Sequence, residues 1–378
     1  MQSAETSANP SGVNQLSFNQ QLFVASFGVI PFYVSPFVLV VLANDLAMPM
    51  SVIGGFPASI MAGQFFAALA LGNVSSGFSL NVLARCSFAV SIAALVWASF
   101  VPLDVFKLLI LGFLLGVSSG VLMFFGTYVS VTAQDKLKAF AVRLGYSLIN
   151  VGVIISLFTV LFAFLNLRGL FLLLALTYLY LLFRFPELKV PASERKPETF
   201  RRPQAIALPL AGFALLLFFF VGQTGFYSFH AAFEFDAIGL PLLFLSAPRI
   251  VAGVLLVVFN TRLIKSGQTR GLLVWGVIEV LCILALSGSI SPFLIIGVIV
   301  LYEISLNILA THVQGNVAQQ YPQLAISFLA PTVMMGAIIG PMSFGALIGL
   351  DFHGLAIAAA ILACAIPSLM RAVWRAGA

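Results

Sequence analysis

Long apolar runs, separated by short polar or glycine- and proline-rich breaks, fill the chain from residue 18 almost to its end. Most of them are near the roughly 20 residues that a helix needs to cross the hydrocarbon core of a bilayer. They lack the polar–apolar alternation that strands of a membrane barrel would show. The pattern predicts twelve transmembrane helices, at about residues 18–43, 51–72, 82–101, 107–133, 144–165, 167–185, 206–229, 239–261, 271–289, 291–312, 325–349 and 352–373.

One long polar segment interrupts this pattern near the middle of the chain. FPELKVPASERKPETFRRPQ, residues 185–204, is rich in proline and charge, so it is expected to be a linker rather than a helix. The expected organisation is a tail, a first half of six helices, a linker and a second half of six helices, at residues 1–17, 18–185, 186–205 and 206–378. Two parallel six-helix repeats are a known plan for transporters.

The composition agrees with a membrane protein. Of the 378 residues, 61% are hydrophobic and 8% are charged, whereas a soluble domain carries about 25% charged residues. Such a chain cannot cover a solvated surface. The three cysteines all lie in apolar runs, where packing is expected rather than a disulfide or a metal site. The first sixteen residues contain no Lys or Arg, so no cleaved signal peptide is expected.

The placement of basic residues predicts an orientation. With the N-terminus inside, only Lys107 and Arg168 fall outside and Arg249 falls within the membrane. The excess of basic residues on one side predicts that both termini are cytoplasmic, in a plasma or bacterial inner membrane. This topology also explains the net charge of +6 without a nucleic-acid partner. The cytoplasmic segments and helix ends receive Arg85, Lys136, Lys138, Arg143, Arg184, Lys189, Arg195, Lys196, Arg201, Arg202, Arg262, Lys265, Arg270, Arg371 and Arg375.

Three stretches resemble parts of a known family. They are VLANDLAMPMSVIGGFPASIMAGQFFAALALG (41–72), GFLLGVSSGVLMFFGTYVSVTAQDKLKAFAVRLG (112–145) and GAIIGPMSFGALIGL (336–350). On these and on its six-plus-six pattern, the chain resembles the major facilitator superfamily over nearly its whole length. The resemblance implies an all-α polytopic membrane protein, with twelve transmembrane helices in two six-helix pseudo-repeats. It also implies transport by alternating access, with helices one, four, seven and ten lining a central cavity.

The chain departs from the family in its charged motifs. The loop between helices two and three reads GNVSSGFSLN (72–81), with Ser76 where the family usually has Asp, so the usual charged gating contact is not supported. The Arg that many drug/proton antiporters carry in helix four is missing, and so is their Gly-Pro motif in helix five. A GxxxGP pattern occurs instead in span eleven, where it indicates close helix packing and a hinge. The gating candidates are therefore Gly336, Gly340 and Pro341.

Ionisable residues inside a membrane are functional candidates by default. Arg249 and Glu303 lie about eleven and twelve residues from the outer ends of spans eight and ten, which places them at similar depth. Placing one charged side chain at the centre of a membrane helix costs roughly 2.5–3.5 kcal/mol on insertion scales, and an ion pair would lower that cost. We expect them to pair, either as proton-coupling groups or as a clamp between two helices. Glu279 in span nine is either neutral and packed or a further coupling group.

Polar side chains within the predicted spans are the substrate-binding candidates, and spans seven and ten are among the expected cavity helices. Helical spacing places Asn307 and Thr311 on the Glu303 face of span ten, and Gln223 and Tyr227 on one face of span seven. In the first half the candidates are Gln64, Tyr146 and Asn150. A largely apolar half opposite a half with Arg and Glu suits an amphipathic or anionic organic solute.

These observations predict a secondary active transporter, coupled to protons, with Glu303 as the proton carrier. Arg249 would tune the proton affinity of Glu303 or compete for an anionic substrate. Two alternatives stay open. One is a passive facilitator in which the pair is a structural bridge, and the other is a transporter-like assembly or lipid-handling factor. No phosphate loop, zinc-ligand spacing or nucleophile elbow is present, so neither an enzyme nor a cofactor is expected. A monomer in contact with membrane lipids is expected.

Overall fold

A computed structural model describes ten stretches of the chain, and almost every residue in them is helical. The stretches are residues 15–33, 55–73, 80–102, 104–162, 167–184, 204–238, 243–266, 270–288, 292–350 and 352–376. They contain no strand, which confirms the all-α prediction for the part of the chain that the structure describes. Nine of the described helices are long and apolar enough to cross a membrane. The chain is therefore a multi-pass integral membrane protein.

The first group of helices comes from residues 15–184. It consists of α1 (Gln15–Ser26) with the 3₁₀ turn η1 (Phe27–Val29), α4 (Gly55–Asn73), α5 (Leu80–Phe100), α6 (Val105–Thr132), α7 (Lys136–Phe162) and α8 (Leu167–Arg184). The second group consists of α9 (Gln204–Ile238), α10 (Leu243–Ser266), α11 (Arg270–Leu286), α12 (Pro292–Gln320), α13 (Pro322–Gly349) and α14 (His353–Ala376).

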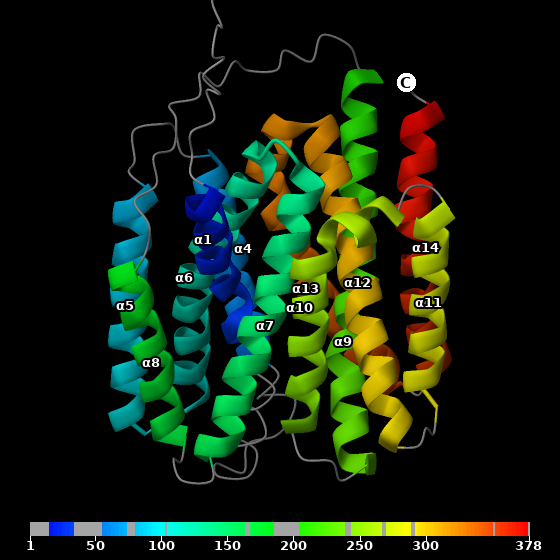
Figure 1. The fold of residues 1–378 in the computed structure, drawn as a ribbon. Coiled ribbons are helices and arrows are strands. Elements are labelled where there is room, and N and C mark those ends of the chain that lie inside the picture. Colours follow the sequence, from blue (N-terminus) through cyan, green and yellow to red (C-terminus); the bar gives the residue numbers. More distant parts are fainter. Residues whose placement is uncertain are drawn as a thin grey trace, which may run out of the picture.

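The two groups are helical bundles that lie side by side, with α1–α8 on the left of Figure 1 and α9–α14 on the right. Their helices run close to vertical in this view. The packed pairs that join them include α4 with α13, α7 with α10, α7 with α12 and α6 with α13. The upper end of the bundle in Figure 1 contains the last residues of α6, α12 and α14 and the first residues of α7.

Several helices extend beyond the apolar runs that predicted them. α7 begins at Lys136 rather than at 144, and α12 continues to Gln320 rather than ending at 312. α1 and α9 begin inside the segments expected to be tail and linker, whose other residues lie outside the described part. Apolarity marks where a helix contacts lipid, whereas Lys, Arg and Gln are good helix formers that let the helix continue into a polar region.

Glycines let helices touch through their backbones. A Cβ on Gly116 of α6 would collide with the backbone of Ile60 in α4 and would lie 3.0 Å from the Cα of Gly63. A Cβ on Gly340 of α13 would lie 2.5 Å from Thr224 Oγ1 and 2.8 Å from the backbone nitrogen of Gly225 in α9. Small residues at such crossings permit the close approach that holds membrane helices together.

The gating candidates of α13 lie at this α9–α13 crossing. Thr224 Oγ1 donates to the carbonyl of Gly336 at 3.1 Å, so a side chain of α9 bonds to the backbone of α13. Pro341 lies inside α13 and cannot donate the helical backbone bond at its position. The close packing that the GxxxGP pattern indicated is present, while the role of these residues in gating stays a prediction.

Replacing Gly340 with Leu should destabilise the protein, because the added atoms have no space against α9. Overpacking of this kind costs about 1–3 kcal/mol. The control is Gly297→Leu, because a Cβ at Gly297 would meet no atom within 4 Å. Thermal unfolding followed by tryptophan fluorescence should show a lower midpoint for Gly340→Leu and a midpoint near the parent's for Gly297→Leu. Equal midpoints for the two variants would contradict the packing described here.

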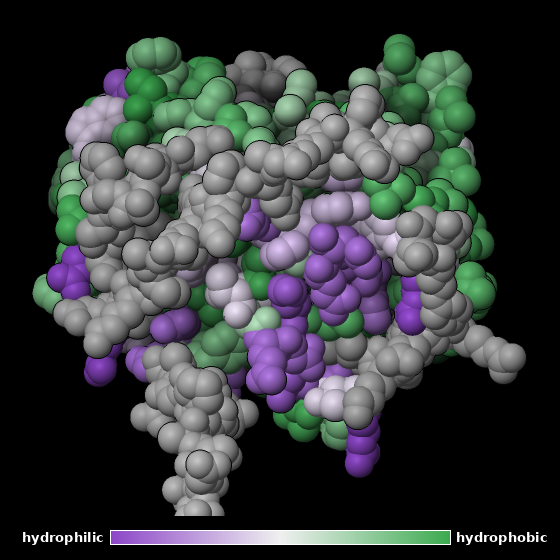
Figure 2. Space-filling model, turned by 90° about the horizontal axis from the view of Figure 1, so that it is seen from above, coloured by the Kyte–Doolittle hydropathy of each residue, from purple (hydrophilic) through white to green (hydrophobic). Residues whose placement is uncertain are grey.

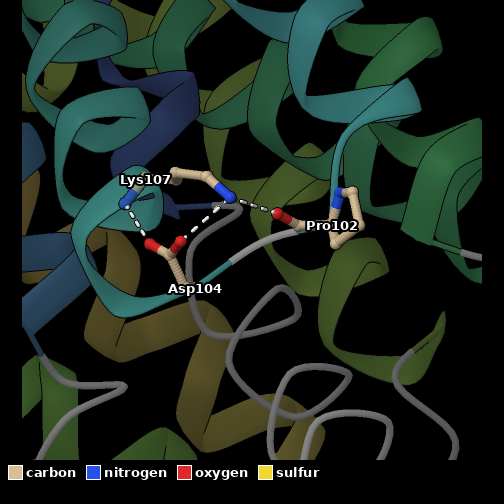
Figure 3. Close-up of polar contacts among 3 residues, drawn as sticks. All are labelled: Pro102, Asp104 and Lys107. Carbon is tan, nitrogen blue, oxygen red and sulfur yellow. Dashed lines mark hydrogen bonds and ion pairs between the residues drawn. The ribbon is translucent and has the colours of Figure 1, made fainter.

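The first turn of α6 is capped by Asp104. Its carboxylate accepts the backbone N–H of Lys107 at 2.9 Å, and the Lys107 ammonium lies 2.9 Å from the other carboxylate oxygen (Figure 3). The same ammonium donates to the carbonyl of Pro102 at 3.0 Å, which holds the preceding turn against the helix. The backbone bond from Lys107, followed by its side chain, holds the pKa of the Asp104 carboxyl below its usual range.

Because the pKa of Asp104 is lowered in the folded protein, its stabilising effect should be present near neutral pH. The effect should be lost as the pH falls through that lowered value. Backbone hydrogen exchange in the first turn of α6 should therefore be faster at about pH 3 than at pH 7, after correction for the intrinsic rate. Asp104→Asn keeps a capping oxygen without the titrating charge, so the pH dependence of exchange should shrink in that variant.

Candidate functional site

A buried ion pair joins α10 to α12. The Nε of Arg249 donates to Oε1 of Glu303 at 3.0 Å, and the side chains are 8% and 1% exposed. The predicted contact between these residues is therefore present. The second oxygen of Glu303 has no hydrogen-bond partner among the described residues, which leaves one acceptor position open on the carboxylate. A buried charge pair with an open position can bind a charged group or exchange a proton.

The two residues meet although they do not lie equally far along their helices. Arg249 is six residues after the first residue of α10, or about 9 Å, whereas Glu303 is eleven residues into α12, or about 16 Å. Residues 239–242, near which the depth prediction began its count for Arg249, lie outside the described part of the chain, and the contact between the two side chains agrees with their predicted similar depth. Pro248, immediately before Arg249, removes one backbone hydrogen bond from the first turns of α10.

Two tyrosines cover the ion pair, one from each group of helices. The guanidinium carbon of Arg249 lies 5.4 Å from the ring centroid of Tyr227 on α9, within the range of a cation–π contact. The ring of Tyr227 meets the ring of Tyr33 edge-to-face, with centroids 5.2 Å apart. Tyr33 belongs to the helical residues that follow η1. The ion pair belongs to the second helix group, and the rings of Tyr227 and Tyr33 connect it to the first group.

Glu279 and Gln223 lie together in a second polar cluster. Glu279 on α11 is fully buried, and neither oxygen of its carboxyl has a hydrogen-bond partner among the described residues. The hydroxyl of Ser305 on α12 donates to the carbonyl of Tyr302 at 3.0 Å. Gln223 on α9 donates to the sulfur of Cys364 at 3.4 Å, and its side-chain oxygen has no partner among the described residues. This cluster lies among α9, α11, α12 and α14, within the second helix group.

The remaining candidates on α12 extend from the ion pair along one buried side of the helix. The amide of Asn307 donates to the backbone carbonyl of Glu303 at 2.7 Å, so its nitrogen is engaged locally. Thr311 is fully buried, and its hydroxyl has no partner among the described residues. The structure therefore places Thr311, but not the amide nitrogen of Asn307, as a free polar group.

In the first helix group, the candidates hold helix one in place. Gln64 of α4 donates to the carbonyl of Gly28 in η1 at 3.0 Å and to the hydroxyl of Ser119 at 2.9 Å. Asn150 of α7 donates to Ser26 Oγ at 2.7 Å. Tyr146 meets Phe23 of α1 edge-to-face at 5.6 Å. These contacts brace the turn at residues 26–29, and the substrate-binding role expected for these side chains stays untested.

Sequence reasoning missed two residues, Tyr33 and Arg143, that the structure places in contacts between helices. Tyr33 was given no role, although a polar aromatic residue on the first expected cavity helix could have been selected. Arg143 was placed with the basic residues at cytoplasmic helix ends. It is instead seven residues into α7, only 3% exposed, and bonded to side chains of two other helices. Nothing in a single sequence distinguishes it from the exposed basic residues near it.

One end of the bundle is polar at its centre. Figure 2 looks onto the end at which α14 ends, and hydrophilic residues gather over the middle of this face while hydrophobic residues occupy much of its rim. The distribution of basic residues predicts that this end is cytoplasmic. In the stretches that the structure describes, no group of three or more His, Cys, Asp or Glu side chains could hold a metal ion.

Comparison with solved structures identifies the fold. The crystal structure of the human organic anion transporter MFSD10 (TETRAN) aligns with a TM-score of 0.65, covering 93% of this chain and 97% of that one. The chain has the major facilitator fold. The major facilitator resemblance seen in the sequence is thereby confirmed at the level of the fold, although the aligned residues are only 16% identical. No family model matches the sequence. No curated protein matches it either.

Proposed function

We propose that the protein is a secondary active transporter that moves a small, amphipathic or anionic organic solute by alternating access, coupled to protons. The observation that carries this proposal is the buried Arg249–Glu303 pair, which contacts the other helix group through Tyr227 and Tyr33. The likeness to a transporter of organic anions supports the same class of solute. We place the protein in a plasma or inner membrane, as a monomer of twelve transmembrane helices in two repeats.

Charge balance at the ion pair provides a route to coupling. An anionic group of the solute that binds Arg249 takes the place of Glu303 as the partner of the guanidinium. Glu303 would then be a buried carboxylate without a cation, which is costly, so it binds a proton and becomes neutral. Solute and proton cross together, and the pair forms again when both leave. The open oxygen of Glu303 and the hydroxyl of Thr311 supply polar contacts on the same helix.

The test is uptake into proteoliposomes that contain the purified protein. Radiolabelled p-aminohippurate, glutarate and taurocholate are suitable probes, because these organic anions cross bare lipid slowly. An inward proton gradient should drive at least one of them above its equilibrium concentration, and a protonophore should remove that accumulation. Uptake that only reaches equilibrium would favour the facilitator. No uptake of any probe, together with a tightly bound lipid in the purified protein, would favour a lipid-handling factor.

The proposed topology places residue 193 of the linker and residue 236 at opposite faces of the membrane. We expect single cysteines replacing Ser193 and Asp236, in a background without Cys86, Cys282 and Cys364, to react with an impermeant maleimide from opposite sides. In intact cells, only the variant at 236 should be labelled, and permeabilisation should add labelling at 193. Labelling of both positions in intact cells would overturn the orientation.

A further inference from the structure

A second arginine is buried in this protein, and the described residues supply no acidic partner for it. Arg143 on α7 is 3% exposed. Among the residues that the structure describes, no carboxylate lies within ion-pair distance of its guanidinium, whereas Arg249 has Glu303. Removing a cation from water is costly unless an opposite charge or several hydrogen bonds compensate. The site of Arg143 therefore attracts negative charge that the described residues do not supply.

The surroundings of Arg143 are shaped to hold a guanidinium. Its Nη1 donates to Thr127 Oγ1 at 3.0 Å, and its carbon atom Cζ lies 5.1 Å from the ring centroid of Phe140. A Cβ on Gly126 would lie 2.9 Å from the Cδ of Arg143 and 3.2 Å from Nη1, so glycine lets the arginine side chain pack closely against α6. Thr127, Phe140 and Gly126 all belong to the first helix group. They position the guanidinium independently of the second group.

The remaining contact of Arg143 crosses between the two groups. Its Nη2 donates to Oε1 of Gln314 on α12 at 3.1 Å. A carbonyl oxygen at this place occupies the position that a carboxylate oxygen would take, but without its charge. Gln314 is eleven residues beyond Glu303 on the same helix, which is about 16 Å along its axis, toward the end of the bundle where α12 ends. A second junction at this end is the bond from Ser327 of α13 to the carbonyl of Gly72, at 2.9 Å.

We propose that Arg143 is a second anion-binding residue, which takes the carboxylate or sulfonate of the solute near the end of the bundle where α12 ends. This inference rests on the proposed transport of an organic anion. When the two groups part at this level, Gln314 moves away with α12, and Nη2 becomes available to the solute. A guanidinium can hold such a group through two parallel hydrogen bonds. Arg249 and Arg143 then bind the anion one after the other, at two positions along the length of α12.

The experiment compares the two directions of transport in proteoliposomes of known protein orientation. The probes are the three radiolabelled anions named above, and the variants are Arg143→Gln, Gln314→Glu and the control Arg262→Gln. Arg262 lies on α10 and is exposed, so its replacement removes the same charge without touching the buried site. The solute concentration that gives half-maximal transport is measured separately from each side.

Arg143→Gln should raise the half-maximal concentration about tenfold or more from the side at which α12 ends, because a charge-assisted hydrogen bond is lost. The value from the opposite side should change by less than about twofold, and Arg262→Gln should resemble the parent protein.

Gln314→Glu supplies a carboxylate to Arg143 within the protein. It should keep or raise the thermal midpoint and raise the half-maximal concentration on the same side, because the new carboxylate competes with the solute. This variant decides the question if Arg143→Gln fails to fold.

Arg143 would be a structural latch between the two groups if both variants changed the maximal rate equally in both directions and left the half-maximal concentrations unchanged. That result would overturn the inference and leave the proposed transport intact. A parent protein that transports none of the anions would overturn the proposed function and this inference with it.

Discussion

Glu303→Gln should abolish accumulation of the solute driven by a pH gradient, while exchange of labelled for unlabelled solute continues. The amide has nearly the shape of the carboxyl, but it cannot take up and release a proton at this position. One pH unit is worth about 1.36 kcal/mol per proton, so coupling of one proton to one monovalent anion gives at most about tenfold accumulation. In the variant, the ratio of internal to external solute should fall to about one. The measurement is radiolabelled uptake with and without an imposed gradient.

The matched control is Glu279→Gln, which removes a carboxyl that is equally buried but has no ion-pair partner among the described residues. This variant should still accumulate solute. If Glu303→Gln accumulates solute as the parent does, Glu303 is not the carrier and Glu279 becomes the next candidate. If the Glu279 variant is also unaffected, the facilitator becomes the better explanation, with Arg249 and Glu303 as a bridge between α10 and α12.

Arg249→Ala should lower the thermal stability of the protein more than Glu303→Gln does. Removing one partner of a buried pair costs about 3–5 kcal/mol in measured cases. Gln at position 303 keeps an oxygen that can accept a hydrogen bond from Arg249, whereas Ala at position 249 leaves Glu303 with no donor in place of the guanidinium. Arg249 also packs on the ring of Tyr227, so its replacement removes a cation–π contact as well. The same variant should lose solute binding, because the cation that attracts the anion is gone. Thermal unfolding and equilibrium binding of the radiolabelled anion measure the two effects.

Combining Arg249→Ala with Glu303→Gln should restore part of the lost stability, because the orphaned carboxylate is then removed as well. The two effects should therefore not add, as expected for residues in direct contact. Binding should not return in the combined variant. Additive losses of stability would mean that the two side chains do not interact in the folded protein. Arg262→Ala, at an exposed position on α10, serves as the control for loss of a positive charge.

Much of the candidate site could be predicted because charge is rare in apolar helices. Arg249 and Glu303 stand out in their runs, and a lone charge in a membrane needs a partner. The pairing therefore followed from the sequence, and the contact between the two side chains confirms it. Gln64 and Asn150 were chosen only as polar side chains within apolar spans, and the structure shows their amides bonded to Gly28 and Ser26 of the first helix. Helical spacing tells which residues share a face, not which neighbour that face meets.

The sequence by itself determined the class of protein, the all-helical architecture and the pair of charges that oppose each other within the membrane. These depend on local composition and period, since the bilayer requires apolar helices whose backbone bonds are satisfied internally. Only the tertiary structure decided that Arg143 is buried, that Gln314 is its partner across the two groups, and that Tyr33 reaches the Arg249 site. Residues 143 and 314 are 171 positions apart. Their contact depends on how two bundles pack against each other, and a pattern of nearest neighbours along one chain does not encode that arrangement.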